Sequence, residues 1–226
     1  KKVKNTRWLG LTVASNKNGT FLLNNKCFVI IFKIKFYKQT KEFHLDNNQF
    51  YNSKWFYNST LSYSENIFNS YSDEIPAIKY QSEEKELVSI SWNALKAKTL
   101  EFQKLLLSNN ISKGDRVAAY MPNMPETVIM MLATSSIGAI FSSASPDFGV
   151  EGVMDRFGQI EPKILVTTDG YNFNGKEINI IEKVNEVVKS LKSIEETILV
   201  PLTNSNEIYN INIVSFYFFS TCLFSR

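Results

Sequence analysis

The sequence predicts an α/β fold built on a doubly wound parallel sheet with a flanking β-hairpin. In residues 114–169, three short apolar runs alternate with two stretches in which apolar residues recur every three or four positions. Turn-forming residues close each run. Strands that alternate with helices pair in parallel through right-handed crossovers, and this pairing defines the fold class.

The chain as a whole has the size and charge of an ordinary globular protein. It has 226 residues and a formal net charge of +3, from 25 basic and 22 acidic residues. This length suits one domain or slightly more, with a sizeable core. The nearly balanced charge gives no reason to expect nucleic acid or an anionic membrane as a partner.

Cysteine and histidine are scarce in this sequence. Cys27, Cys222 and His44 are its only residues of these two types. They provide neither a structural zinc site nor a disulfide framework, and a single histidine excludes a histidine-based triad elsewhere. We therefore expect a reducing, cytoplasmic compartment.

The N-terminal segment, residues 1–54, has no role that its residues indicate. Within the apolar run 27–37, residues 32–37 alternate Phe and Ile with lysine and tyrosine in a strand-like pattern, and the run is too short for a membrane span, which needs about 20 residues. Residues 55–68 predict a loop followed by a short amphipathic helix.

Residues 75–91 predict the flanking hairpin. Two strand-like runs, 75–81 and 87–91, enclose an acidic break at 82–86. Ser91 is placed to cap the following helix, which should end near residues 109–110. The face that this helix should bury is formed by residues spaced three and four apart: Trp92, Leu95, Thr99, Phe102 and Leu106.

Strands and helices then alternate to residue 201. Pro125 suits the first turn of one helix, and Gly138 suits the position just after its end. A further amphipathic helix covers residues 181–191. The predicted strands are residues 117–121, 139–143, 164–168 and 197–201.

The helix after the second of these strands carries its own start signal. Ser145, Pro146 and Asp147 read as an N-cap, a first-turn proline and a first-turn acid, and Glu161-Pro162 should end the helix. Amide groups at such a helix start favour anions, but Asp147 opposes them, so plain capping and ligand lining both stay open. Asp155 and Arg156 on this helix read as solvated charges.

Ligands of open parallel sheets bind beyond the carboxyl ends of the strands, here residues 121–124, 142–148 and 168–176. The last of these segments ends in Gly-x4-Gly-Lys, the spacing of a phosphate-binding P-loop. Glu177 stands where that motif needs Ser or Thr, and its carboxylate would repel phosphate, so we reject an ATP-type P-loop. Lys176 is interpreted either as a single phosphate contact or as a solvated lysine.

Residues 114–176 and the segment WFYNSTLSYSENIF at 55–68 resemble the acyl-CoA synthetases of the adenylate-forming superfamily. The resemblance covers residues 55–205 in one register. It implies the partial N-terminal domain of such an enzyme, flanked by residues 1–54 and an aromatic-rich tail at 206–226. Ser62 stands where the family has Asn.

The resemblance also implies a reaction and a set of ligands. The family uses ATP and Mg²⁺ to adenylate a carboxylic acid and then transfers the acyl group to CoA. The sequence segments SPDFG and DRFGQIEPK resemble those of family members that act on acetoacetate, so the resemblance implies acetoacetate as the acid. By resemblance, Lys176 falls on a contact to a CoA phosphate, Phe173 replaces a second basic contact, and Asp147 and Phe148 fall beside the CoA tunnel. The oligomeric state is left open.

The family's Ser/Thr/Gly-rich phosphate loop ending in Lys does not occur in these 226 residues. We therefore expect the chain alone to be inactive. One hypothesis is a truncated ligase in which residues 20–40 and 208–224, with their abrupt change of composition, are translated non-coding sequence. The alternative is a non-catalytic module that binds CoA, a nucleotide or a partner.

Overall fold

The computed structural model describes residues 58–69, 74–83, 86–203 and 213–215. The strand-like segment at 27–37 and the rest of residues 1–54 lie outside this range, as does nearly all of the tail. The chain divides into two compact units, Lys1–Ser70 and Tyr71–Arg226. The domain boundaries expected near residues 54 and 205 stay predictions.

In the first unit the described residues form helix α2, Tyr63–Asn69, which confirms the short helix expected there. The Ser62 side chain accepts a hydrogen bond from the Glu65 amide at 3.2 Å, as an N-cap does. Glu65 also places an acid in the first helical turn, where the helix dipole favours negative charge.

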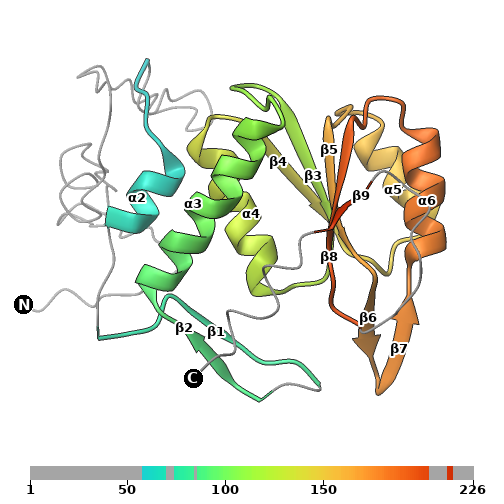
Figure 1. Ribbon diagram of the computed structural model, residues 1–226, viewed down its shortest axis with the longest axis horizontal. Helices are drawn as coiled ribbons and strands as arrows, with labels where there is room; N and C mark the ends of the chain where they lie inside the picture. The colour runs from blue at the N-terminus through green and yellow to red at the C-terminus, as the bar shows by residue number, and fades with distance from the viewer. Residues whose placement is uncertain (1–57, 70–73, 84–85, 204–212, 216–226) are drawn as a thin grey trace, which may run out of the picture. The chain divides into compact units, whose positions relative to one another are not determined.

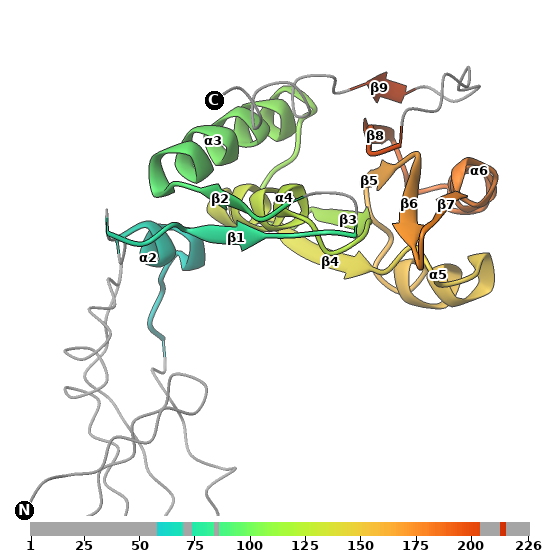
Figure 2. The same ribbon diagram turned by 90° about the horizontal axis from the view of Figure 1, so that it is seen from below.

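The second unit contains a five-stranded parallel sheet with the strand order β4-β3-β5-β8-β9 (Figure 2). The first four strands confirm the expected ones to within one residue at their starts and ends. The fifth strand, β9, was not expected, because three residues are too few to show a periodicity. It is defined by its parallel pairing with β8, in which Ile198 lies opposite Val214. The strands are β3 Arg116–Tyr120, β4 Ile140–Ala144, β5 Ile164–Thr168, β8 Glu196–Val200 and β9 Ile213–Ser215.

Helices cover both faces of this sheet, so the doubly wound arrangement is confirmed. Figure 1 shows α3, Trp92–Ser108, and α4, Pro125–Ser136, on one side of the strands. Helices α5, Val150–Phe157, and α6, Ile181–Ser190, lie on the other side. A side-chain hydrogen bond of 2.7 Å from Gln103 to Ser136 links α3 to α4.

The predicted helix ends are largely confirmed. The Ser91 hydroxyl accepts a hydrogen bond from the Ala94 amide at 3.1 Å and caps α3. Pro125 begins α4, and Gly138 follows its C-cap with a φ of 74°. Trp92 is only half-buried, whereas the other four expected core residues of α3 are buried.

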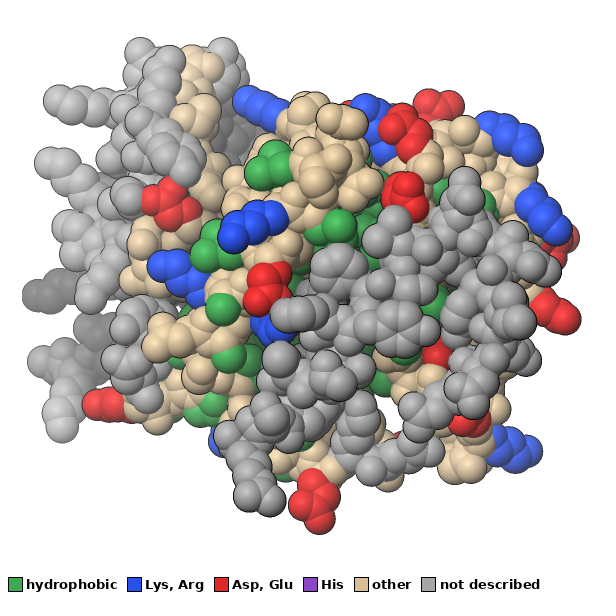
Figure 3. All heavy atoms as spheres, viewed as in Figure 1, with side chains coloured by type: hydrophobic (Ala, Val, Ile, Leu, Met, Phe, Trp, Pro, Cys, Tyr) green, Lys and Arg blue, Asp and Glu red, His purple; other side chains and the backbone are tan. Residues whose placement is uncertain are grey.

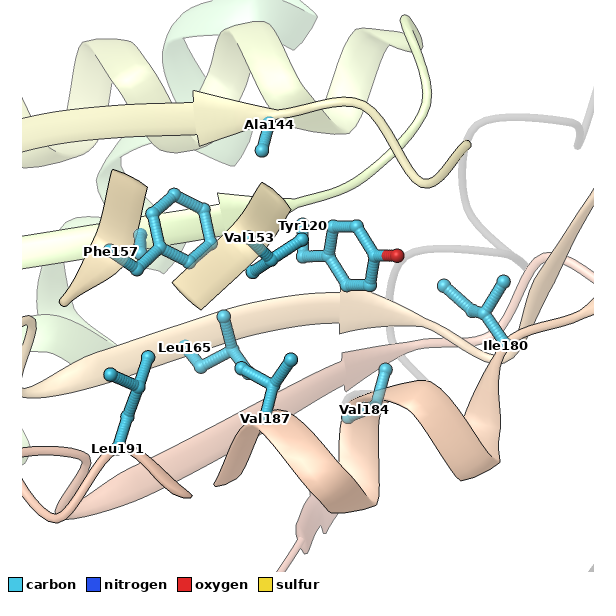
Figure 4. Packing of buried hydrophobic residues seen from close by; sticks show 10 residues of the cluster. Tyr120, Ala144, Val153, Phe157, Leu165, Ile180, Val184, Val187 and Leu191 are labelled. Atoms are coloured by element: carbon cyan, nitrogen blue, oxygen red, sulfur yellow. The ribbon is translucent and has the colours of Figure 1, made fainter. Parts of the chain in front are cut away.

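A cluster of apolar side chains fills the space between the sheet and helices α5 and α6 (Figure 4). Burying one large aliphatic side chain contributes about 1.5–3 kcal/mol, so this cluster is a principal source of stability for the unit. Its buried members are Ala118, Tyr120, Ala144, Val153, Phe157, Leu165, Ile180, Val184, Val187 and Leu191.

Two antiparallel hairpins complete the described part of this unit. Strands β1, Ile78–Tyr80, and β2, Val88–Ile90, confirm the expected hairpin. Strands β6, Gly170–Phe173, and β7, Lys176–Asn179, form a second hairpin where a loop was expected. Within the described residues, no helix is long and apolar enough to cross a membrane.

Candidate functional site

The sheet has a topological switch point at the carboxyl ends of β3 and β5. From β3 the chain moves to β4 on one side, then crosses over to β5 on the other side of β3. Tyr120 and Thr167 pair in register where these two strands end. In open α/β sheets such a point leaves a crevice in which ligands bind.

Tyr120, the last residue of β3, organises the turn that follows β4. Its buried hydroxyl donates to the Phe148 carbonyl at 2.6 Å and lies 3.1 Å from the Pro146 carbonyl. Burial, followed by the nearby Tyr171 and Asp147, raises the pKa of Tyr120 to about 12. The hydroxyl therefore keeps its proton at neutral pH and can donate to these carbonyls.

The predicted helix start at Ser145 is wrong. Residues 145–148 form a turn, in which the Phe148 amide donates to the Ser145 carbonyl at 3.2 Å. Helix α5 begins only at Val150, and its N-cap is Gly149, which has no side chain to make a capping hydrogen bond. Ser-Pro-Asp suits a turn as well as a helix start, and the Tyr120 hydroxyl holds two carbonyls of the turn form.

Phe148 is 37% exposed and lies against a guanidinium group. The central carbon of the Arg156 guanidinium is 4.1 Å from the centre of the Phe148 ring, a cation–π distance. The same guanidinium donates to the Gly152 carbonyl at 2.6 Å. Arg156 is therefore held along α5 and over the ring, rather than being only a solvated charge.

Asp169 directly follows β5 and is completely buried. One carboxylate oxygen accepts hydrogen bonds from the amides of Leu202 and Thr203, at 2.8 and 2.9 Å. Its own carbonyl accepts from the Ile180 amide at 3.0 Å. Asp169 thus ties the end of β5 to the segment after β8 and to the start of α6.

Lys176 lies at the tip of the β6–β7 hairpin, where its side chain is exposed. The turn before it consists of Asn174 and Gly175, with φ of 53° and 70°, which is a two-residue hairpin turn. The P-loop spacing thus belongs to a hairpin and not to a loop that opens a helix. Both turn amides donate to the Glu83 carboxylate, which comes from the connection between β1 and β2.

The structure brings only some of the expected ligand residues together. Asp147 and Phe148 lie in the turn around Tyr120, and Tyr171 is near enough to affect the pKa of Tyr120. Lys176 belongs instead to the hairpin tip, beside the turn that Glu83 engages. No described contact joins Lys176 to Asp147 or Phe148.

Five contributors to the site geometry were not assigned a site role from the sequence. A tyrosine at the end of a buried strand needs a hydrogen-bond partner, so Tyr120 carried a readable signal. The Asn174-Gly175 pair between two extended runs is likewise a local signal, since it predicts a hairpin turn. Arg156 was noted only as a charge, and Glu83 and Asp169 act on partners far along the chain, which no local pattern indicates.

Charges of both signs are mixed over the described surface shown in Figure 3, in keeping with the small net charge. In the part of the chain that the structure describes, no three His, Cys, Asp or Glu side chains lie together as a metal site would require.

Comparison with known proteins identifies the family of this chain. The sequence pattern of AMP-binding enzymes matches residues 68–214, well over half of the chain. The chain belongs to the AMP-binding enzyme family.

Two of its relatives and a structural neighbour share one name. Acetoacetyl-coenzyme A synthetase of Rhizobium meliloti (strain 1021) is 43% identical over 157 residues, which are 70% of this chain and 24% of that protein. Acetoacetyl-CoA synthetase of Mus musculus is 40% identical over 149 residues, 66% of this chain and 22% of that protein. The solved acetoacetyl-CoA synthetase from Streptomyces lividans superposes with a TM-score of 0.74 at 29% identity, covering 84% of this chain and 29% of that one. The chain thus spans about a quarter of the length of the curated relatives it matches.

Proposed function

We propose that this chain is the CoA-side part of an acetoacetate–CoA ligase. The observation that carries the proposal is the match of its parallel-sheet unit to acetoacetyl-CoA synthetases in both sequence and structure. In the proposed reaction, ATP with Mg²⁺ adenylates acetoacetate and releases pyrophosphate. The thiolate of CoA then displaces AMP and forms acetoacetyl-CoA.

The described residues do not fit the ATP and Mg²⁺ part of this reaction. They hold no cluster of acidic or imidazole side chains for a metal, and the 226-residue sequence has no Ser/Thr/Gly-rich phosphate loop. Phosphate chemistry depends on such groups to position and neutralise charge. We therefore assign no step of adenylation to these residues.

The CoA side is a better fit. Lys176 has an exposed side chain that can attract a phosphate, and Phe148 is 37% exposed, which leaves apolar surface for an uncharged part of the coenzyme beside the Arg156 guanidinium. The exposed Asp147 carboxylate repels phosphate, so its proposed place is beside an uncharged part of CoA. We propose these three residues as the coenzyme contacts, in a protein located in the cytoplasm.

The transcript and its product test this function together. We expect an unbroken message that continues past Asn206 into a glycine-rich phosphate loop. The protein that it encodes should form acetoacetyl-CoA from acetoacetate, ATP and CoA, and should release one AMP per turnover. A message that ends at Arg226, or a longer product without acetoacetate-dependent AMP release, would contradict the proposal.

A non-catalytic CoA-binding module is the second candidate, because Lys176 and Phe148 are present while the ATP-handling groups are not. Calorimetry on the purified chain separates the two candidates. Saturable CoA binding that is lost in Lys176→Ala, in a chain whose transcript ends at Arg226, would favour the module.

A further inference from the structure

We infer that Glu83 is a built-in competitor for phosphate at the tip of the β6–β7 hairpin. Its carboxylate binds the two turn amides next to Lys176, where a phosphate monoester would otherwise bind. That the monoester belongs to CoA rests on the proposed function; the competition itself does not.

The contact has the geometry of anion binding. One Glu83 oxygen accepts from the Asn174 amide at 3.0 Å, and the other accepts from the Gly175 amide at 2.8 Å. Successive amides in a tight turn can point to one side and form a concave anion site, and here both are directed to a single carboxylate. A negatively charged group is therefore already bound in the turn.

A phosphate bound in this turn would have a lysine one residue away. Lys176 directly follows the two amides and is exposed. A phosphate monoester offers three oxygens and nearly two charges, enough for both amides and an ammonium group together. Glu83 repels such a ligand as long as its carboxylate stays in the turn.

Glu83 can also leave the turn easily. It is exposed, and both hydrogen bonds are open to solvent. Hydrogen bonds from Gly175 and then Asn174 hold the pKa of Glu83 below its ordinary value, so the carboxylate is charged at neutral pH. A site that is blocked for nine-tenths of the time loses about tenfold in apparent affinity, and removal of the blocking group restores that loss.

The test uses the 226-residue chain labelled with ¹⁵N. The amide signals of Asn174 and Gly175 are followed during titration with inorganic phosphate, with CoA, and with dephospho-CoA, which lacks the 3′-phosphate. Glu83→Gln removes the charge and keeps the shape, and Glu83→Ala removes the side-chain acceptor as well. Glu86→Gln, an exposed glutamate in the same connection, is the matched control.

We expect both Glu83 variants to bind inorganic phosphate at least about threefold more tightly than the unchanged chain and Glu86→Gln. Equal or weaker binding in both Glu83 variants would overturn the inference, because Glu83 would then only fasten the hairpin. Absence of any phosphate effect on the two amides, in every variant, would also overturn it. If phosphate behaves as expected but CoA binds no better than dephospho-CoA, the competition stands and the proposed contact to the coenzyme phosphate fails.

Discussion

A single buried hydroxyl sets the shape of the turn at 145–148. Tyr120→Phe removes this donor and leaves the Phe148 carbonyl without it. We expect a loss of about 1–2 kcal/mol in the free energy of unfolding, measured by urea denaturation with an unchanged m value. Tyr171→Phe is the control, since Tyr171 is a half-buried tyrosine that packs against the same apolar cluster. Equal losses of unfolding free energy in the two variants would show that the hydrogen bonds of the Tyr120 hydroxyl do not stabilise the fold.

Gly170 is required by the close approach of β7. A Cβ on Gly170 would lie 2.6 Å from the Ile178 carbonyl oxygen, which is a backbone atom. We expect Gly170→Ala to destabilise the unit by about 1–3 kcal/mol, measured by thermal or urea unfolding.

Gly149→Ala is the control for that substitution. A Cβ at Gly149 meets no atom within 4 Å, and its φ is −71°. Alanine is a poorer N-cap than glycine but also lowers the entropy of the unfolded chain, and because these two effects oppose each other we expect a change of less than about 1 kcal/mol. A Gly170→Ala variant as stable as Gly149→Ala would mean that the two hairpin strands do not pack as described.

At the scale of elements, a network at the amino ends of β3 and β5 joins the loop after α3 to the sheet. The Asp115 carboxylate pairs with the Lys163 ammonium at 2.9 Å and accepts from the amide and hydroxyl of Ser112, each at 2.8 Å. The hydrogen bond from Lys163, followed by those from Ser112, lowers the pKa of Asp115 from 3.8 to about 2.

This network predicts a pH dependence of stability. Because the pKa is lower in the folded state, the contribution is complete above about pH 4 and is lost as the pH falls toward 2. At pH 6 we expect Asp115→Asn to be less stable by about 1 kcal/mol. The difference between the two proteins should shrink toward pH 2 in urea titrations. A difference that stays constant from pH 6 to pH 2 would contradict the role given to the charge.

Periodicity and turn residues predicted most elements of the second unit. Apolar runs bounded by Gly114, Pro122 and Pro162 placed the first and third strands of the central stretch to within one residue. The start at Ser145 was misplaced because its local signal is compatible with two structures. The choice between them is made by Tyr120, 26 residues away from Pro146 in sequence.

The candidate site was less predictable than the elements that carry it. Asp147, Phe148 and Lys176 came from a resemblance, and their roles stay proposals. The contacts that shape the site join residues far apart in sequence: Glu83 binds Gly175, 92 residues later, and Asp169 binds Thr203, 34 residues later. A pattern read over a few residues cannot reveal such pairs, because only the folded sheet brings them together.

At the scale of the whole molecule, the parallel sheet, its switch point and the hairpin tip belong to an AMP-binding enzyme family member. The proposed function gives the exposed Lys176 and Phe148 to CoA, and the 226-residue sequence contains no Ser/Thr/Gly-rich phosphate loop for ATP. We therefore propose a division of roles, in which these residues contact the coenzyme and other segments of the proposed ligase bind the nucleotide.

Release of AMP tests that division most directly. The purified 226-residue chain is mixed with ATP, Mg²⁺, acetoacetate and CoA, and AMP is measured by chromatography beside the protein encoded by the full transcript. We expect AMP from the chain to stay at the level of the blank, and AMP from the longer protein to rise with acetoacetate. Acetoacetate-dependent AMP release by the 226-residue chain itself would contradict the claim that its residues lack the ATP-handling groups.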